Sequence, residues 1–212
     1  MKTCYIACAL DCDIQISPNE GDLVIGADRG YFTLVENGIA PQLAIGDFDS
    51  YTGKIDCENT IVYPVKKDDT DSALAIKYAV REGYCKIVVF GAIGGNLDHT
   101  IANVALAANY AEKGIDVIFI DGENVLFAIH NSVINFDENA VGRISVFSYG
   151  DVAKSVCEKG LLYNLENATL SNRVPLGVSN EFAGTPSEIS VLDGTLLIYT
   201  SRKNFEKHLT RA

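Results

Sequence analysis

Short apolar runs alternate with segments of helical periodicity over the first 122 of the 212 residues, and this alternation limits the possible folds most narrowly. The apolar runs at 4–10 and 23–27 have the length of strands that are covered on both faces. Residues 71–82 instead carry apolar side chains at helical spacing. Strands that alternate with helices form a mostly parallel sheet through right-handed crossovers. We therefore predict that residues 1–122 form an α/β domain of the Rossmann-like type.

The remaining residues, 123–212, show a different pattern. Short apolar runs are separated there by Asn, Asp, Gly and Pro, and no convincing helical periodicity is present. The runs 188–192 and 195–200 flank Asp193-Gly194, a dipeptide typical of two-residue hairpins. We predict an all-β sandwich for this second domain, with a hairpin at that dipeptide and a polar C-terminal end that frays.

Three acidic clusters follow apolar runs in the first domain, each where a strand candidate gives way to a turn or a helix. In a parallel sheet the carboxyl ends of the strands share one edge, where ligands bind. We therefore expect the clusters to lie close together, and carboxylates that meet require a cation. Mg²⁺ is suited to this role, because it combines a few carboxylates with water and substrate phosphates. The clusters are Gly46-Asp47-Phe48-Asp49-Ser50, Lys67-Asp68-Asp69-Thr70-Asp71 and Gly94-Gly95-Asn96-Leu97-Asp98-His99.

Each cluster, taken alone, also has a structural interpretation. Asp and Ser favour turns through local hydrogen bonds, and Asp or Thr at the start of a helix caps its free N–H groups. The second cluster holds more acids than capping requires, and we assign Asp69 to the capping role. The position of every cluster after a strand candidate favours a shared, magnesium-dependent site for phosphoryl chemistry.

The turn 91–96 joins a strand candidate to a helix candidate and contains three glycines. Such a turn lets backbone N–H groups approach a phosphate beside a helix N-terminus. Its sequence matches neither the dinucleotide fingerprint nor the P-loop pattern. Polar and basic residues near the ends of other strand candidates are further candidates for contact with a phosphate. The predicted phosphate-binding residues are Asp28, Arg29, Lys67, Gly94, Gly95 and Asn96.

In order and spacing, the three clusters resemble the motifs of the thiamine pyrophosphokinase (thiamin diphosphokinase) family. A later pair, Ser179-Asn180, resembles the family's thiamine-contacting segment. The resemblance implies an ATP- and Mg²⁺-binding catalytic domain over 1–122, and a β-sandwich over 123–212 that binds thiamine and mediates dimerisation. It also implies a homodimer with sites at the subunit boundary. The implied reaction transfers the terminal diphosphate of ATP to the hydroxyl of thiamine and releases AMP.

The resemblance also implies roles for individual residues. Asp71 and Asp98 are the implied catalytic residues, and Ile198 lies near the place where some relatives carry a thiamine-stacking Trp. Asn96 departs from the family pattern, which has Arg there, and so lacks a fork-shaped phosphate donor. The implied metal ligands are Asp47, Asp49, Asp68, Asp71 and Asp98, and the implied thiamine contacts are Ser179, Asn180 and Ile198.

Two alternatives stay open on the sequence alone. A related diphosphotransferase could use the same metal site for another alcohol, such as a hydroxymethylpterin. A non-catalytic nucleotide-binding homologue could keep the acidic motifs without turnover, and Asn96 is the residue that most favours this interpretation. Substrate competition separates the first alternative from a thiamine enzyme, and ATP binding without AMP release would indicate the second.

The composition limits the partners of the protein. A net charge of −11 argues against nucleic-acid binding, which needs clustered Lys and Arg. No run approaches the roughly 18 apolar residues of a membrane-spanning helix, so no membrane partner is expected. Residues 1–10 lack the features of a secretory signal peptide. We expect a cytoplasmic enzyme that acts on small molecules.

Overall fold

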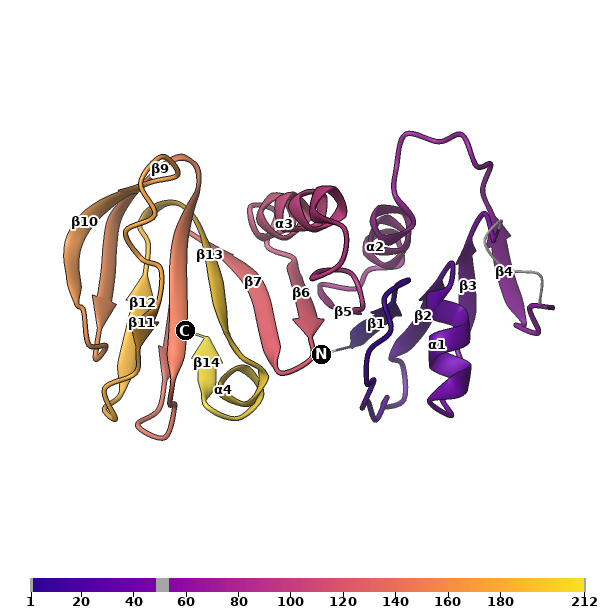
Figure 1. Ribbon diagram of the computed structural model, residues 1–212, viewed down its shortest axis with the longest axis horizontal. Coiled ribbons are helices and arrows are strands. Elements are labelled where there is room, and N and C mark those ends of the chain that lie inside the picture. Colours follow the sequence, from indigo (N-terminus) through magenta and orange to yellow (C-terminus); the bar gives the residue numbers. More distant parts are fainter. Residues whose placement is uncertain (1, 49–53, 212) are drawn as a thin grey trace. The chain divides into compact units, whose positions relative to one another are not determined.

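The computed structural model describes residues 2–48 and 54–211, and Figure 1 shows its helices and strands. The chain divides into two compact units. Unit 1 comprises Met1–Leu106 and Ile115–Gly122, and unit 2 comprises Ala107–Gly114 and Glu123–Ala212. Asp49, one of the predicted metal ligands, lies outside the described residues. Within the described part of the chain, no helix is long and apolar enough to cross a membrane.

The strands of unit 1 form a parallel sheet with the order β6-β5-β1-β2-β3-β4. Ala7 lies opposite both Gly26 and Phe90, so the carboxyl ends of β1, β2 and β5 share one edge. The acidic clusters and the glycine turn follow strands at this edge. The strands are β1 (Thr3–Ala7), β2 (Leu23–Ala27), β3 (Leu43–Gly46), β4 (Asn59–Val62), β5 (Lys86–Phe90) and β6 (Asp116–Asp121).

Apolar side chains explain how the helices of unit 1 pack on this sheet. Helix α2 (Asp71–Arg81) corresponds to the predicted helix 71–82 and buries Ala73 and Ile76 among the contacts that it makes with β1, β2 and β3. Thr70 caps it by accepting a hydrogen bond from the Ala73 N–H (3.2 Å), so the capping role predicted for Asp69 is wrong. Helix α1 (Gly30–Glu36) packs on β1 and β2, and α3 (Leu97–Ala111) begins directly after the glycine turn (Figure 1).

The strands of unit 2 pair in the antiparallel sense. The long strand β9 pairs with β13 through its first part and with β10 and β12 through its last part, so it joins the strands of this unit. Together the two units give the chain a mixed parallel and antiparallel sheet structure. The strands are β7 (Asn124–His130), β8 (Val133–Phe136), β9 (Arg143–Lys159), β10 (Leu165–Ser171), β11 (Asn180–Glu181), β12 (Ser187–Ser190), β13 (Asp193–Ser201) and β14 (Leu209–Arg211).

The predicted hairpin at Asp193-Gly194 is wrong, and β9 is the reason. β12 pairs with β8 and β9, whereas β13 pairs with β7 and β9, so β9 lies between the two strands. Gly194 instead allows β13 to lie close to β9. A Cβ at this position would lie 2.9 Å from the Cα of Ala153, which is too short for a normal contact. Long-range pairing of a 17-residue strand outweighs the local turn preference.

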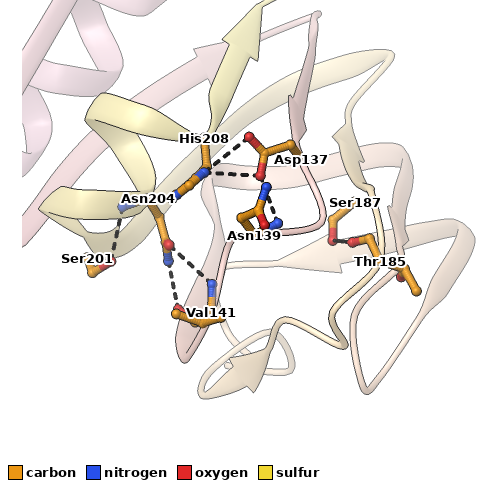
Figure 2. A network of polar contacts seen from close by, with 8 residues as sticks. All are labelled: Asp137, Asn139, Val141, Thr185, Ser187, Ser201, Asn204 and His208. Atoms are coloured by element: carbon orange, nitrogen blue, oxygen red, sulfur yellow. Dashed lines mark hydrogen bonds and ion pairs between the residues drawn. The ribbon is translucent and has the colours of Figure 1, made fainter.

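The prediction of a frayed C-terminal end is also wrong, since this segment forms α4 (Arg202–Lys207) and β14. Ser201 caps α4 by accepting a hydrogen bond from the Asn204 N–H (3.2 Å), and β14 pairs with β8. The fully buried side chain of Asn204 bonds both the N–H (3.2 Å) and the C=O (2.9 Å) of Val141 (Figure 2). Specific hydrogen bonds, together with the packing of Phe205 on Phe127 (5.0 Å between ring centroids), therefore hold this mostly polar segment.

Candidate active site

A cavity of about 190 Å³ opens in unit 1 at the carboxyl edge of the parallel strands. Its walls come from the residues after β1, the end of β2, the turn after β5, and the first turns of α2 and α3. Four of the predicted site residues line it, namely Asp28, Asp71, Gly95 and Asn96. The other lining residues are Cys8, Ala9, Leu10, Ala27, Thr70, Ser72, Gly91, Ala92, His99 and Asn103.

Lys67 links two of the acidic clusters beside this cavity. Its Nζ atom donates a hydrogen bond to Asp47 Oδ2 (2.7 Å) and lies 2.9 Å from Asp71 Oδ1. The side chains of Lys67 and Asp47 are each only 12% exposed, so the contact escapes most of the screening that weakens surface ion pairs. Burial of the ammonium group opposes its charge, but the two carboxylates outweigh this effect and raise the pKa of Lys67. An internal cation thus holds the two carboxylates together.

The donor set of this cluster fits a divalent cation. Asp71 Oδ1 is buried and accepts no hydrogen bond from a described residue, since Lys67 Nζ approaches it outside hydrogen-bond geometry. Mg²⁺ commonly takes one or two carboxylates when substrate phosphates supply further oxygens. Across residues 2–48 and 54–211, no group of three Asp, Glu, His or Cys side chains is assembled for a metal. Asp47 and Asp71 are the carboxylates of this cluster that would bind such a metal together with phosphate oxygens.

Two residues with side chains at this edge adopt the left-handed backbone conformation. Asp28 (φ 49°) directly follows β2, and Phe48 (φ 55°) directly follows Asp47. This conformation is uncommon for residues with a side chain and costs on the order of 1–3 kcal/mol. The Asp28 N–H donates to the carbonyl oxygen of Ile45 (2.7 Å), which ties the turn after β2 to β3. The surrounding structure thus holds the two turns that carry Asp28 and Asp47.

The turn between β5 and α3 requires glycine at two positions. Gly91 has φ 65°, and a Cβ there would lie 2.4 Å from the carbonyl oxygen of Leu10; Gly94 has φ 88°, and a Cβ there would lie 2.7 Å from Asp121 Oδ2. The Gly94 N–H already donates to Thr100 Oγ1 (3.3 Å). Of the three residues predicted in this turn, Gly95 and Asn96 therefore line the cavity and Gly94 does not.

Other predicted residues lie apart from the cavity lining. Asp98 is exposed in the first turn of α3, and its Oδ1 accepts a hydrogen bond from the His99 N–H (2.9 Å). Arg29 is exposed and forms an ion pair with Asp11 (3.0 Å), and Asp68 is exposed as well. The metal, catalytic and phosphate-binding roles of these residues stay predictions.

Asn180, one of the predicted thiamine contacts in unit 2, uses its side-chain amide within the fold. Its Nδ2 donates to the carbonyl oxygen of Tyr163 (2.7 Å) and to Glu158 Oε2 (3.0 Å). Its Oδ1 accepts hydrogen bonds from the N–H groups of Tyr163 (3.1 Å) and Glu181 (2.9 Å). The buried amide therefore fixes the segment that contains it.

The other two predicted thiamine contacts differ in exposure. Ser179 is exposed, adopts φ 59°, and donates its backbone N–H to Ser145 Oγ (3.0 Å). Ile198 lies in β13 with no exposed surface. Ser179 is thus better exposed than Ile198 to touch a ligand, and the thiamine-binding roles of both stay predictions.

Four polar residues at the cavity were not among the predicted site residues. Thr70 and Ser72 flank Asp71 in the sequence, and His99 and Asn103 lie on α3. Thr70 was interpreted only as a helix cap. Asn103 interrupts the apolar stripe that includes Ile101 and Val104, and a polar residue within such a stripe is the signal that identifies it.

Sequence models of one family match most of the chain. The model described as thiamin pyrophosphokinase, catalytic domain, matches residues 17–119, and that of the vitamin B1 binding domain matches 131–196. Thiamine pyrophosphokinase of Bacillus subtilis (strain 168) is 31% identical over 197 residues, which cover 89% of this chain and 92% of the relative. Thiamin pyrophosphokinase 1 of Caenorhabditis elegans is 26% identical over 173 residues, with coverages of 76% and 69%.

Solved structures show the same relationship. The crystal structure of thiamine pyrophosphokinase from Bacillus subtilis matches with a TM-score of 0.84 and 27% identity over 94% of this chain and 99% of that chain. Thiamin pyrophosphokinase from Geobacillus thermodenitrificans matches with a TM-score of 0.79 and 28% identity over 94% and 97%. The fold, the acidic cavity and these matches define the protein as a transferase. More particularly, the chain belongs to the thiamin pyrophosphokinase family.

Proposed function

We propose that the protein transfers the terminal diphosphate of ATP to the hydroxyl oxygen of thiamine in a reaction that requires Mg²⁺. The observation that carries the proposal is the Asp47–Lys67–Asp71 cluster at the cavity of unit 1, in a member of this family. The thiamine oxygen attacks the β-phosphorus, and the bond from this phosphorus to the oxygen shared with the α-phosphorus breaks. AMP leaves with that oxygen, and the hydroxyl proton is released.

The side chains of the cluster have distinct proposed roles. Asp47 and Asp71 would hold Mg²⁺, with Asp49, Asp68 and Asp98 as further candidate ligands. When bound, the ion would supply positive charge beside the phosphates. Lys67, whose raised pKa keeps it cationic near neutral pH, balances the two carboxylates and can donate to a phosphate oxygen. Asp71 and Asp98 are the candidate acceptors of the hydroxyl proton.

The two units have separate proposed tasks. Unit 1 acts as a Rossmann-like nucleotide-binding domain, a role supported by a cavity at the carboxyl edge of parallel strands, where ligands bind in open α/β sheets. Gly95, Asn96 and the N-terminus of the 15-residue helix α3 would face the phosphates. Unit 2 binds thiamine, a role supported by the match of residues 131–196 to a vitamin B1 binding domain. The homodimer is proposed on the family resemblance alone.

One incubation with ATP, Mg²⁺ and thiamine, followed by mass spectrometry, tests this function. We expect thiamine diphosphate and AMP in equal amounts, and neither product when EDTA removes the metal. ADP in place of AMP would indicate transfer of a single phosphoryl group and would contradict the proposal.

Two control measurements separate the alternatives. A hydroxymethylpterin offered in competition with thiamine should leave the rate unchanged if thiamine is the substrate. Magnesium-dependent ATP binding without AMP release would identify a non-catalytic homologue. Asn96, which stands where the family has Arg, would then be the first residue to change, by Asn96→Arg.

A further inference from the structure

A buried chain of hydrogen bonds connects the glycine turn after β5 to the first turn of α2. Asn103 on α3 is 3% exposed and lines the cavity. Its Nδ2 donates to the carbonyl oxygen of Ala92 (2.6 Å), and its Oδ1 accepts the hydroxyl of Ser72 (2.9 Å). Ser72 Oγ lies 3.0 Å from Thr70 Oγ1, which accepts the Ala73 N–H (3.2 Å). The chain therefore spans three segments that line one cavity.

The donor and acceptor of every hydrogen bond in this network can be assigned by starting from the Ala92 carbonyl at one end and the Ala73 N–H at the other. The Ala92 carbonyl can only accept, so the Asn103 amide must present Nδ2 to it and Oδ1 to Ser72. The single proton of Ser72 then goes to Asn103, and the Thr70 hydroxyl must donate to Ser72 Oγ. Thr70 Oγ1 keeps a lone pair for the Ala73 N–H. Each group has a partner, and a fully satisfied buried network of this kind rigidifies what it connects.

Asp71 lies between the two hydroxyl residues of this chain. Thr70 and Ser72 are its direct neighbours, so their hydrogen bonds fix the backbone that carries the Asp71 carboxylate. Lys67 Nζ pairs with buried Oδ1 of this carboxylate (2.9 Å) and ties it toward Asp47, whereas the hydrogen bonds of Thr70 and Ser72 tie the Asp71 backbone to α3 and the glycine turn. The position of the Asp71 carboxylate relative to the glycine turn therefore depends on the hydrogen-bond chain that ends at Asn103.

We propose that Asn103 is a positioning residue, which sets the Asp71 carboxylate against the Gly91–Asn96 turn so that both reach one metal–nucleotide ligand. The inference rests on the proposed function, because it assigns that ligand to the cavity. Asn103 acts through Ser72 and Thr70 and needs no contact with the ligand. Removal of a residue that orients a metal ligand without touching the metal commonly lowers metal affinity or activity by about 10–100-fold.

Asn103→Ala tests this inference by removing both hydrogen bonds at the end of the chain. The measurement is the binding of Mn²⁺ in the presence of ATP, followed by electron paramagnetic resonance, together with a thermal melt of the same sample. We expect the dissociation constant for Mn²⁺ to rise about 10-fold in the folded variant. An unchanged Mn²⁺ dissociation constant would overturn the inference.

Asn204→Ala is the matched control. Asn204 is also a buried asparagine that bonds a backbone carbonyl, but it lies in unit 2 and does not line the cavity. It should lower the melting temperature without changing Mn²⁺ binding, and an equal effect of both variants on Mn²⁺ would mean that lost stability alone weakens the site.

Ser72→Ala keeps the inference testable if Asn103→Ala does not fold. It removes the middle hydroxyl while the bond from Asn103 to Ala92 remains, and we expect a smaller rise of the Mn²⁺ dissociation constant. No rise in Ser72→Ala would overturn the inference in that case. The proposed function has a separate readout, since wild-type protein that binds Mn²⁺ and ATP but forms no thiamine diphosphate contradicts the function and leaves the positioning comparison intact.

Discussion

Asp71 is the side chain on which the proposed chemistry depends most, because it joins the Lys67 cluster to the cavity. Replacing it by Asn keeps the shape of the side chain and removes its charge. We expect Asp71→Asn to lower the rate of thiamine diphosphate formation about 100-fold or more, since charge at the phosphates is then stabilised less well. The melting temperature should stay close to that of the wild type. Steady-state kinetics with a thermal melt provides the measurement.

Asp69 provides the matched control for Asp71, because it belongs to the same acidic cluster. Its carboxylate pairs with the half-exposed Lys77 (2.7 Å), and exposed pairs of this kind contribute about 0–1 kcal/mol. Asp69→Asn should therefore leave both activity and stability near the wild-type values. Near-normal turnover in Asp71→Asn, or an equal loss in both variants, would contradict the role of Asp71.

The acidic site could be predicted from the sequence because charged residues cluster directly after apolar strand candidates. Asp47, Lys67 and Asp71 follow strand candidates, and the structure brings these three together. Asn103 was missed because a single polar residue in a helix has many uses, and only the fold shows that Ser72 and Ala92 lie beside it. Side-chain partners separated by 31 residues in the chain cannot be inferred from spacing.

Glu158 should make the stability of the protein depend on pH. It is 1% exposed, and its Oε1 has no hydrogen-bond partner among the described residues. Burial raises the pKa of Glu158 from 4.5 to about 7, so the folded chain holds this proton more tightly than the unfolded chain does. The resulting stability is fully present below the unfolded pKa and is lost as the pH rises through about 7. The loss is about 3 kcal/mol.

Glu158→Gln removes this titration while keeping an oxygen acceptor for the amide of Asn180. Urea denaturation of both proteins at about pH 5 and about pH 8 measures the difference. The fall in unfolding free energy between these conditions should be smaller in Glu158→Gln by about 2.5 kcal/mol, because part of the loss already occurs between pH 4.5 and about pH 5. Glu166→Gln, at an exposed position, should retain the wild-type pH dependence. Equal pH dependence in wild type and Glu158→Gln would show that Glu158 does not titrate in this range.

At the scale of elements, local patterns predicted the helix 71–82 well and the pairing of β12 with β13 badly. Apolar spacing and a capping Thr70 are properties of one segment, so they can be recognised without the fold. The strand that separates β12 from β13 comes from residues 143–159, and its insertion depends on long-range pairing. The polar helix α4 lacked an apolar stripe and depends on one buried side chain, Asn204.

Asn204→Ala should therefore destabilise unit 2. The change leaves the N–H and C=O of Val141 without their side-chain partner and removes the contact with Thr200 Oγ1 (3.2 Å), as Figure 2 shows for Val141. We expect a loss of about 3 kcal/mol in unfolding free energy, measured by urea denaturation. Lys203→Ala, on an exposed position of the same helix, should have little effect. A similar loss in both variants would mean that helix α4, rather than the Asn204 bonds, carries the stability.

At the scale of the whole molecule, the residues proposed for the two substrates lie in different units. Asp71 belongs to unit 1 and Ser179 to unit 2. The family resemblance implies a homodimer with sites at the subunit boundary, so each site would take Asp71 from one subunit and Ser179 from its partner. A site built from two subunits and a site built from one chain therefore differ in whether two inactive variants can complement each other.

Mixing two inactive variants should restore activity if the two residues come from different subunits. Asp71→Asn and Ser179→Arg, whose added cation repels the cationic thiazolium, are each expected to be inactive as homodimers. After unfolding and refolding together, half of the dimers are mixed, and each mixed dimer holds one site with both native residues. The recovered activity should be about a quarter of the wild-type value, because a two-fold symmetric dimer has two equivalent sites. A site built within one chain would recover none, since every chain then carries one of the two defects.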